Sequence, residues 1–300
     1  MPLQRLAGRP ETADPTTAAA WSRTTRLDGV MAEGEGSSEV LIGLLDGPVD
    51  ASHPGFGDGF RLRSEAAGSL ATRHGTAVAG VLAARRDSGA PGVCPGCRVL
   101  VRPVFTSASN GEGPVSTGPS EVAEGVYGCV AAGARLINLS AGFDGAGRPS
   151  RVLSSALDHA AGRGVLVVVA AGNDGRVGGS PLVSHPAVVP VTSCDAEGLP
   201  LPDGNLGLSV ARRGVRAPGM PVRSLAPGGG FADLGGTSLS AALVTGALAL
   251  AWSLAPGAPV AVPRRALLGD RSARRCVVPP LLDAARLARE MSAPVMEVRP

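Results

Sequence analysis

Residues 165–171 read VLVVVAA and residues 40–45 read VLIGLL, two short and almost wholly apolar runs. Near-continuous Val, Leu and Ile of this length are typical of strands buried on both faces of a parallel sheet. Further runs of this kind lie at 98–105, 135–140 and 187–193, and segments of helical period separate them. The alternation predicts an α/β fold in a single domain: a doubly wound, mostly parallel sheet with helices on both faces.

The remaining segments set the expected boundaries of this domain. We expect helices at 74–84, 120–133, 151–162, 239–255 and 281–290. The polar residues 1–37 are predicted to form an irregular N-terminal arm, residues 38–290 the domain, and residues 291–300 a loose C-terminal tail.

The composition excludes several classes of function. Apolar residues make up 44% of the chain and charged residues 18%, a balance typical of a globular protein. The net charge is +3, the basic residues are scattered and aromatic residues are only 3%, so nothing indicates nucleic-acid binding. All 28 basic residues are Arg. The absence of Lys excludes P-loop, Schiff-base and Ser-Lys chemistry.

Two further features bear on the compartment. The first residues contain no apolar stretch of the kind found in secretion signals, which favours a cytoplasmic protein. Segment 239–255 is apolar but contains Ser and Thr, so we interpret it as a buried helix and expect no membrane contact.

Cys94 and Cys97 form a C-x-x-C motif without the second pair that a zinc site requires. A structural thiol pair is favoured, and a redox or metal role is left open.

Four polar residues stand at predicted strand ends or helix starts. Asp46 and Asn173 follow apolar runs, and His74 and Ser238 open predicted helices. In a parallel sheet, ligands bind beyond the carboxyl ends of the strands. A serine hydroxyl becomes a nucleophile when a carboxylate-oriented imidazole takes its proton, and an amide N–H can bind the oxyanion that develops. The set therefore predicts acyl-transfer chemistry, although Asp46 and Ser238 taken alone are also explained as helix caps.

The motifs around these residues resemble the subtilisin-like serine peptidases. The resemblance extends from about residue 38 to about residue 255 and lies in four blocks: His74-Gly75-Thr76 with Val78-Ala79-Gly80, Gly236-Thr237-Ser238 with Val244 and Gly246, Ala170-Ala171-Gly172-Asn173, and Ile137-Asn138-Leu139-Ser140. The resemblance implies that Asp46 orients His74 and that His74 acts as general base and then acid. It further implies that Ser238 attacks the scissile carbonyl and that Asn173 completes the oxyanion hole.

The resemblance also implies a substrate-binding strand and shows local departures. Ser140, Ala141 and Gly142 would lie along an extended peptide substrate, which pairs through its main chain. Gly47-Pro48 stand where the family usually has a small hydroxyl residue followed by Gly, and Pro48 lacks an N–H that could help to hold Asp46. Ala77 replaces a common second His, and Ala242 replaces a frequent Pro.

A narrower resemblance concerns the substrate. The sequence DGPVD at 46–50, together with GVCPGCRVLVRPVF at 92–105, is similar to the proteases that mature ribosomally made peptides of the cyanobactin type. We therefore predict a cytoplasmic endopeptidase that cleaves a peptide or protein, with a ribosomal precursor as one such substrate. The alternatives are a catalytically silent peptide-binding module of the same fold and a peptide macrocyclase, for which segment 106–120 could act as a lid.

The remaining candidates receive structural interpretations. The other three histidines, His53, His159 and His185, are interpreted as structural, and Asp174 as a solvated loop carboxylate. No cofactor or metal site is predicted. Calcium binding is left open because no D-x-D-x-D-G loop is present, whereas dispersed carbonyl groups can also bind calcium. The oligomeric state is left open as well.

Overall fold

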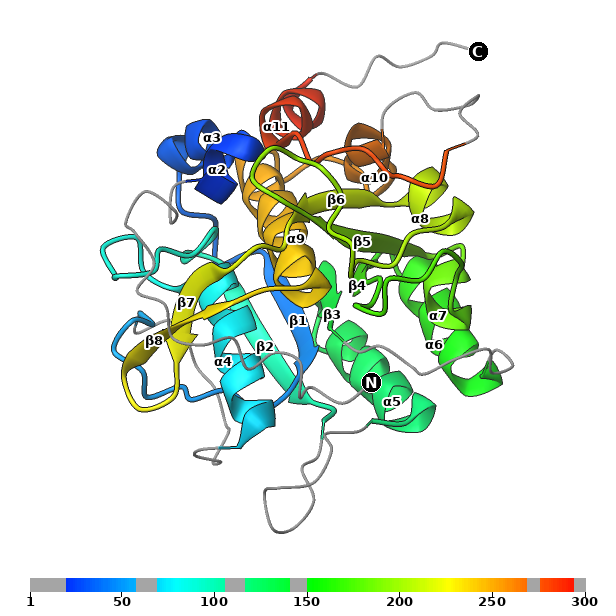
Figure 1. Cartoon of the computed structure of the whole chain (residues 1–300), viewed down its shortest axis with the longest axis horizontal. Helices are drawn as coiled ribbons and strands as arrows, with labels where there is room; N and C mark the ends of the chain where they lie inside the picture. Colours follow the sequence, from blue (N-terminus) through cyan, green and yellow to red (C-terminus); the bar gives the residue numbers. More distant parts are fainter. Residues whose placement is uncertain (1–19, 58–68, 106–116, 141–149, 269–275, 294–300) are drawn as a thin grey trace.

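A computed structural model describes residues 20–57, 69–105, 117–140, 150–268 and 276–293 (Figure 1). Its main sheet contains β1 (Leu41–Asp46), β2 (Arg98–Pro103), β3 (Leu136–Leu139), β4 (Leu166–Ala170), β5 (Val188–Cys194) and β6 (Val215–Pro218). The strands are parallel and lie in the order β2-β1-β3-β4-β5-β6. The predicted parallel sheet is therefore confirmed.

Helices cover both faces of this sheet. One face carries α4 (Leu70–Ala83) and α9 (Thr237–Leu254), and the other carries α5 (Pro119–Ala131) and α6 (Arg151–Gly162). Side chains alternate along a strand, so Ile42 and Leu44 of β1 pack toward α9 while Leu41 and Leu45 pack toward α5. This double burial explains why the strands are apolar at nearly every position, and it confirms the doubly wound α/β prediction.

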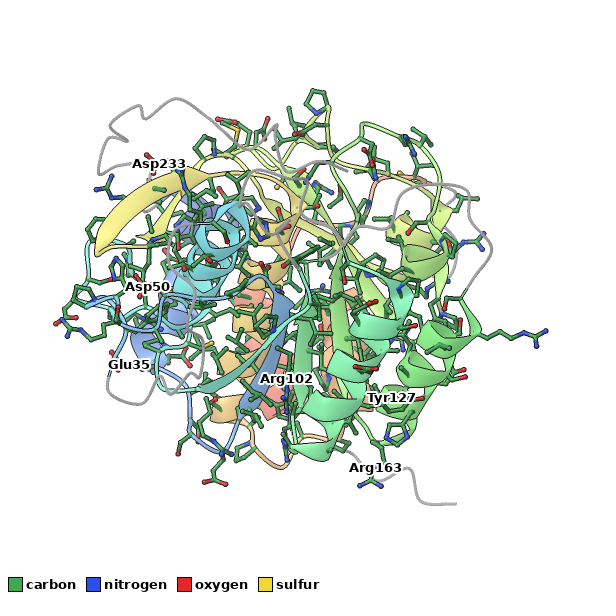
Figure 2. The ribbon with its side chains drawn as sticks, turned by 90° about the horizontal axis from the view of Figure 1, so that it is seen from below. Glu35, Asp50, Arg102, Tyr127, Arg163 and Asp233 are labelled. Carbon is green, nitrogen blue, oxygen red and sulfur yellow. The ribbon has the colours of Figure 1, made fainter. Side chains whose placement is uncertain are left out.

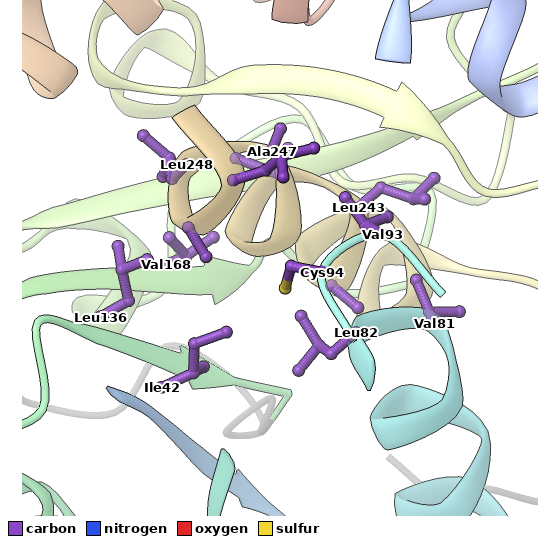
Figure 3. Close-up of a cluster of buried hydrophobic side chains, with 14 of the residues drawn as sticks. Ile42, Val81, Leu82, Val93, Cys94, Leu136, Val168, Leu243, Ala247 and Leu248 are labelled. Atoms are coloured by element: carbon purple, nitrogen blue, oxygen red, sulfur yellow. The ribbon is translucent and has the colours of Figure 1, made fainter. Parts of the chain in front are cut away.

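The central helix α9 is buried on nearly all sides. Figure 3 shows Leu243, Ala247 and Leu248 of this helix packed over Ile42 and Val168 of the sheet. By length and composition α9 could cross a membrane, but its residues from Thr237 to Trp252 lie inside the protein. The prediction of a buried helix is confirmed. Each large apolar side chain buried here stabilises the fold by about 1.5–3 kcal/mol relative to an exposed one. Because such side chains pack along the helix, the start of α9 is fixed in position.

The predicted N-terminal arm is wrong for the part of it that the structure describes. Residues 20–33 form two helices, α2 (Ala20–Thr24) and α3 (Leu27–Glu33), and they bury Trp21, Leu27 and Val30 in the main core. With five and seven residues, these helices are too short to give a clear periodic pattern in the sequence. Residues 1–19 lie outside the described part of the chain.

The C-terminal boundary also differs slightly from the prediction. The last helix described, α11 (Ala284–Ser292), extends beyond residue 290 and buries Met291. It packs against α3, α9 and α10 (Ala261–Leu268). The rest of the predicted tail, residues 294–300, is outside the described residues.

Two further short helices, α7 (Pro181–Ser184) and α8 (Leu208–Arg213), lie beside β5.

A β-hairpin that the sequence did not reveal leads into α9. It consists of β7 (Val222–Ala226) and β8 (Gly230–Leu234), which pair antiparallel. The three glycines 228–230 form the end of its turn and the start of β8. The hairpin packs against α4. Figure 2 shows Asp233 of this hairpin and Tyr127 of α5 on opposite sides of the sheet.

Candidate active site

Asp46 and His74 are joined by a buried hydrogen bond. Asp46 is the last residue of β1 and is fully buried, and its Oδ1 lies 2.7 Å from Nδ1 of His74. The helix that carries His74 begins at Leu70, where the Ser69 hydroxyl accepts a hydrogen bond from Thr72 N. His74 therefore lies in the second turn of α4 rather than opening the helix as predicted. The carboxyl end of β1 and this turn of α4 bring the carboxylate and the imidazole together.

The charge of Asp46 controls the protonation of His74. Burial by itself lowers the pKa of His74, because it disfavours the charged imidazolium. The negative charge of Asp46 and the hydrogen bond that its carboxylate accepts from His74 Nδ1 act in the opposite direction and outweigh burial, so the pKa of His74 is raised above its usual value. An imidazole with this environment can take up a proton near neutral pH.

Glycine contacts hold α4 close to the turn that follows Asp46. Gly47 N donates to Asp46 Oδ1 over 2.6 Å, which supplies the backbone hydrogen bond that Pro48 cannot make. A Cβ atom at Gly47 would overlap the carbonyl oxygen of Ala71, so the small hydroxyl residue that the family usually has here would not fit. Asp46 Oδ2 is buried and has no partner among the described residues.

Gly75→Ala is expected to destabilise the protein by about 1–3 kcal/mol, since its Cβ would overlap the carbonyl oxygens of Gly47 and Pro48. Denaturant unfolding of both proteins checks this value. Gly162→Ala in α6 is the matched control, because no atom lies within 4 Å of the added Cβ. A Gly75→Ala protein as stable as the control would show that α4 does not depend on this close approach.

Ser238 lies in the first turn of the central helix α9. Gly236, with φ of 101°, turns the chain into the helix, and Ser238 is 7% exposed. The helix packs against α4, which carries His74. The N-terminal end of a helix has partial positive charge, which favours an oxyanion beside it. Within the described residues no hydrogen bond joins the Ser238 hydroxyl to His74, and such bonds are often long before substrate binds.

Asn173 is hydrogen-bonded to the residue before Ser238. It follows β4, and its Oδ1 accepts a hydrogen bond from Thr237 N over 2.9 Å. Gly172 N donates to Thr237 Oγ1 over 3.2 Å. A Cβ at Gly236 would lie 3.1 Å from Asn173 Nδ2, so the glycine allows this amide to approach the start of α9. Because Thr237 N occupies Oδ1, the Nδ2 group is the end of the side chain left to donate to an oxyanion.

Ser140 lies at the end of β3, next to a buried polar network. Its hydroxyl accepts from Asn138 Nδ2 over 3.1 Å, and Asn138 Oδ1 accepts from Thr245 Oγ1 of α9 over 2.9 Å. Asn138 is fully buried. The sequence analysis includes it in the block 137–140 but gives it no role, although it interrupts an apolar run. Ala141 and Gly142 lie outside the described residues, so their predicted role in substrate binding stays a prediction.

The other candidate residues have partners of their own. Both ring nitrogens of His53 are hydrogen-bonded, Nε2 to the Gly230 carbonyl at 2.7 Å and Nδ1 to Gly55 N at 2.9 Å. The ring of His159 lies 5.2 Å from that of Tyr127 on α5. These contacts agree with the structural interpretation of both histidines.

Cys97 of the C-x-x-C pair lies near the end of α9 that is opposite to Ser238. Cys94 and Cys97 are both buried and reduced, and Cys97 Sγ is 3.6 Å from Ser253 Oγ near the end of that helix. The hydrogen bond between the two thiols raises the pKa of Cys94 and lowers that of Cys97 to about 7. Among the described residues, no three His, Cys, Asp or Glu side chains gather as metal ligands.

The chain is similar to known serine peptidases. Residues 37–275 match the model of the subtilase family. Subtilisin amylosacchariticus from Bacillus subtilis subsp. amylosacchariticus is 30% identical over 233 residues, which are 75% of this chain and 58% of that protein. The chain thus spans little more than half the length of this relative. Subtilisin DY from Bacillus licheniformis is 30% identical over 239 residues, which cover 77% of this chain and 83% of that protein.

Solved structures with the same fold include enzymes of peptide maturation. The prenylagaramide maturation protease PagA has a TM-score of 0.78 and 29% identity, covering 89% of this chain and 98% of its own. A serine-to-alanine mutant of the PatA protease domain has a TM-score of 0.77 and 29% identity, covering 86% and 96%. The PatG macrocyclase in complex with peptide has a TM-score of 0.75 but 18% identity, covering 91% and 97%, and so supports the fold alone. The PagA and PatA structures agree with the resemblance to maturation proteases.

Proposed function

Because the chain belongs to the subtilase family of serine peptidases, we propose that it is an endopeptidase whose catalytic residues are Asp46, His74 and Ser238. The observation that carries this proposal is the buried 2.7 Å hydrogen bond between Asp46 Oδ1 and His74 Nδ1. That bond fixes the imidazole so that its other nitrogen, Nε2, is free to take a proton. The proposal includes a cytoplasmic location.

The reaction would proceed in two halves. Ser238 Oγ attacks the scissile carbonyl carbon and gives its proton to His74 Nε2, while Asp46 stabilises the resulting imidazolium. The carbonyl oxygen, now an oxyanion, receives hydrogen bonds from Asn173 Nδ2 and Ser238 N. When the intermediate collapses, the C–N bond breaks, the leaving amine takes the proton from His74, and an acyl-enzyme remains. Water then attacks the ester with His74 again acting as base.

Asn173→Ala is expected to lower kcat by about two to three orders of magnitude with little change in substrate affinity. The reason is that the Nδ2 donor acts on charge that develops only in the transition state. Steady-state kinetics on a peptide amide separates the two parameters. A loss of affinity with unchanged kcat would mean that Asn173 instead contacts the substrate in its ground state.

The proposed substrate is a ribosomally made precursor peptide. Support comes from the two solved structures at 29% identity that belong to PatA and PagA, which are described as maturation proteases of patellamide and prenylagaramide. Incubation of the purified protein with a panel of precursor peptides, followed by mass spectrometry, tests this proposal. The expected product is a pair of linear fragments from one bond, and Ser238→Ala is the control that should leave every peptide intact.

The same experiment distinguishes the alternative functions. A macrocyclase would resolve the acyl-enzyme with the peptide's own amine, so its product would be lighter than the linear fragment by one water. A catalytically silent module would bind a peptide without changing its mass. Either result would replace the proposal of an endopeptidase.

A further inference from the structure

The loop that carries Asn173 belongs to no helix or strand. It covers residues 171–176, and its Gly172 and Gly175 have left-handed backbone conformations with φ of 102° and 64°. A donor that stabilises an oxyanion must be held to within about 0.5 Å of its working position. Backbone hydrogen bonds hold the two ends of this loop, from Ala171 N to the Val191 carbonyl and from Gly175 N to the Asp203 carbonyl. Side-chain contacts add to them in positioning Asn173.

The side chain of Asn205 supplies these contacts. Its Nδ2 donates to the Ala171 carbonyl over 3.1 Å and to Asp174 Oδ2 over 3.3 Å. Its Oδ1 accepts from Asp174 N over 3.1 Å and from Arg176 N over 3.0 Å. Both hydrogens and both lone pairs of the amide are therefore used. The contacts lie on both sides of Asn173 along the chain, and none involves Asn173 itself.

The backbone N–H of Asn205 makes a fifth contact with the loop, and the start of α9 holds the loop from the opposite side. Asn205 N donates to the Gly172 carbonyl over 2.9 Å, and a Cβ at Gly172 would lie 2.5 Å from Asn205 Nδ2. On its opposite side the loop is hydrogen-bonded to Thr237 at the start of α9, through Gly172 N and Asn173 Oδ1. The loop is thus held between Asn205 and the helix that carries Ser238.

We propose that Asn205 is a positioning residue of the active site, which holds loop 171–176 so that Asn173 Nδ2 points to the oxyanion. The inference rests on the proposed function and extends it to a residue that touches no reacting atom. It also gives a role to Asp174, whose carboxylate is exposed but bonded to Asn205 rather than only solvated. The effect of Asn205 on the reaction passes through Asn173.

The test is a double-mutant cycle with separate measurement of kcat and KM. The substrate is a fluorogenic peptide amide selected from a library on the wild-type protein. Asn205→Ala should lower kcat by about 10- to 100-fold at nearly unchanged KM, because a displaced Asn173 Nδ2 no longer points to the oxyanion. In the Asn173→Ala background the same change should lower kcat no further, because the donor is already absent. Asp203→Ala is the control: it removes only an exposed side chain and keeps the Asp203 carbonyl that accepts from Gly175 N, so it should leave both parameters unchanged.

Three results would overturn the inference: an equal fall of kcat in both backgrounds, a rise in KM alone, or no change. If Asn205→Ala does not fold, Asn205→Asp takes its place, because it keeps the acceptor for two backbone N–H groups and loses the donor to Ala171. It should lower kcat alone, and an unchanged kcat overturns the inference. Failure of the proposed function is a separate outcome, in which the wild-type protein neither cleaves peptides nor reacts with a fluorophosphonate at Ser238.

Discussion

Ser238→Ala is expected to lower kcat by about six orders of magnitude, the loss that follows removal of a nucleophilic serine from a working triad. Without Oγ no acyl-enzyme forms, and His74 has no hydroxyl to deprotonate. The residual rate would come from binding and the oxyanion donors acting on water. Measurement requires a sensitive fluorogenic peptide and protein free of host proteases.

The Ser238→Ala protein should fold like the wild type. Ser238 is the second residue of α9, and among the described residues no hydrogen bond of its hydroxyl would be lost. A small change in unfolding free energy, about 1 kcal/mol at most, is expected from a hydroxyl at a helix start. Wild-type-like activity in a folded Ser238→Ala protein would exclude Ser238 as the nucleophile.

Asp46→Asn is expected to lower kcat by about four orders of magnitude. The change removes the negative charge that stabilises the His74 imidazolium. It also places an amide NH₂ either against His74 Nδ1, which favours the wrong tautomer, or in the buried position of Oδ2, which has no described partner. Single-turnover kinetics at saturating substrate measure this effect on the chemical step.

The pH dependence gives Asp46→Asn a second readout. In the wild type burial lowers the pKa of His74, but the Asp46 charge raises it by more, so kcat/KM should fall as pH drops through a pKa above the usual value of histidine. Once that charge is gone, burial dominates and the fall should move to lower pH. Asp50→Asn is the matched control, because Asp50 bonds Ser52 and Gly228 instead of His74. The same shift in both variants, or in neither, would contradict a specific Asp46–His74 pair.

The sheet could be predicted because each of its inner strands is buried on both faces. In β4, Val168 packs toward α9 and Val167 and Val169 pack toward α5 and α6, so the strand is apolar at every position. Such a continuous apolar run can be recognised as a buried strand from the sequence alone. The hairpin β7–β8 lacks it: the residues of β8 are exposed or half-buried, and β8 begins with Gly230, which follows two glycines of the turn.

A residue of the candidate site could be predicted only where a reactive side chain stands within a recognisable sequence motif. Asp46, His74, Ser238 and Asn173 combine a reactive group with a recognisable block of sequence. Asn205 has an unreactive amide, and its bonds to Ala171 and Arg176 join segments that only the folded chain brings together. The sequence did not show the start of α4 for a similar reason, since the capping Ser69 stands five residues before His74, where the motif begins.

The measurement that tests the central claim most directly is labelling of Ser238 with a fluorophosphonate probe, followed by intact-mass detection. An activated serine hydroxyl attacks phosphorus and displaces fluoride, and it needs His74 as its base. The account predicts one adduct per chain on Ser238 in the wild-type protein and almost none in folded His74→Ala. An unlabelled wild-type protein that is folded, or equal labelling of both proteins, would contradict it.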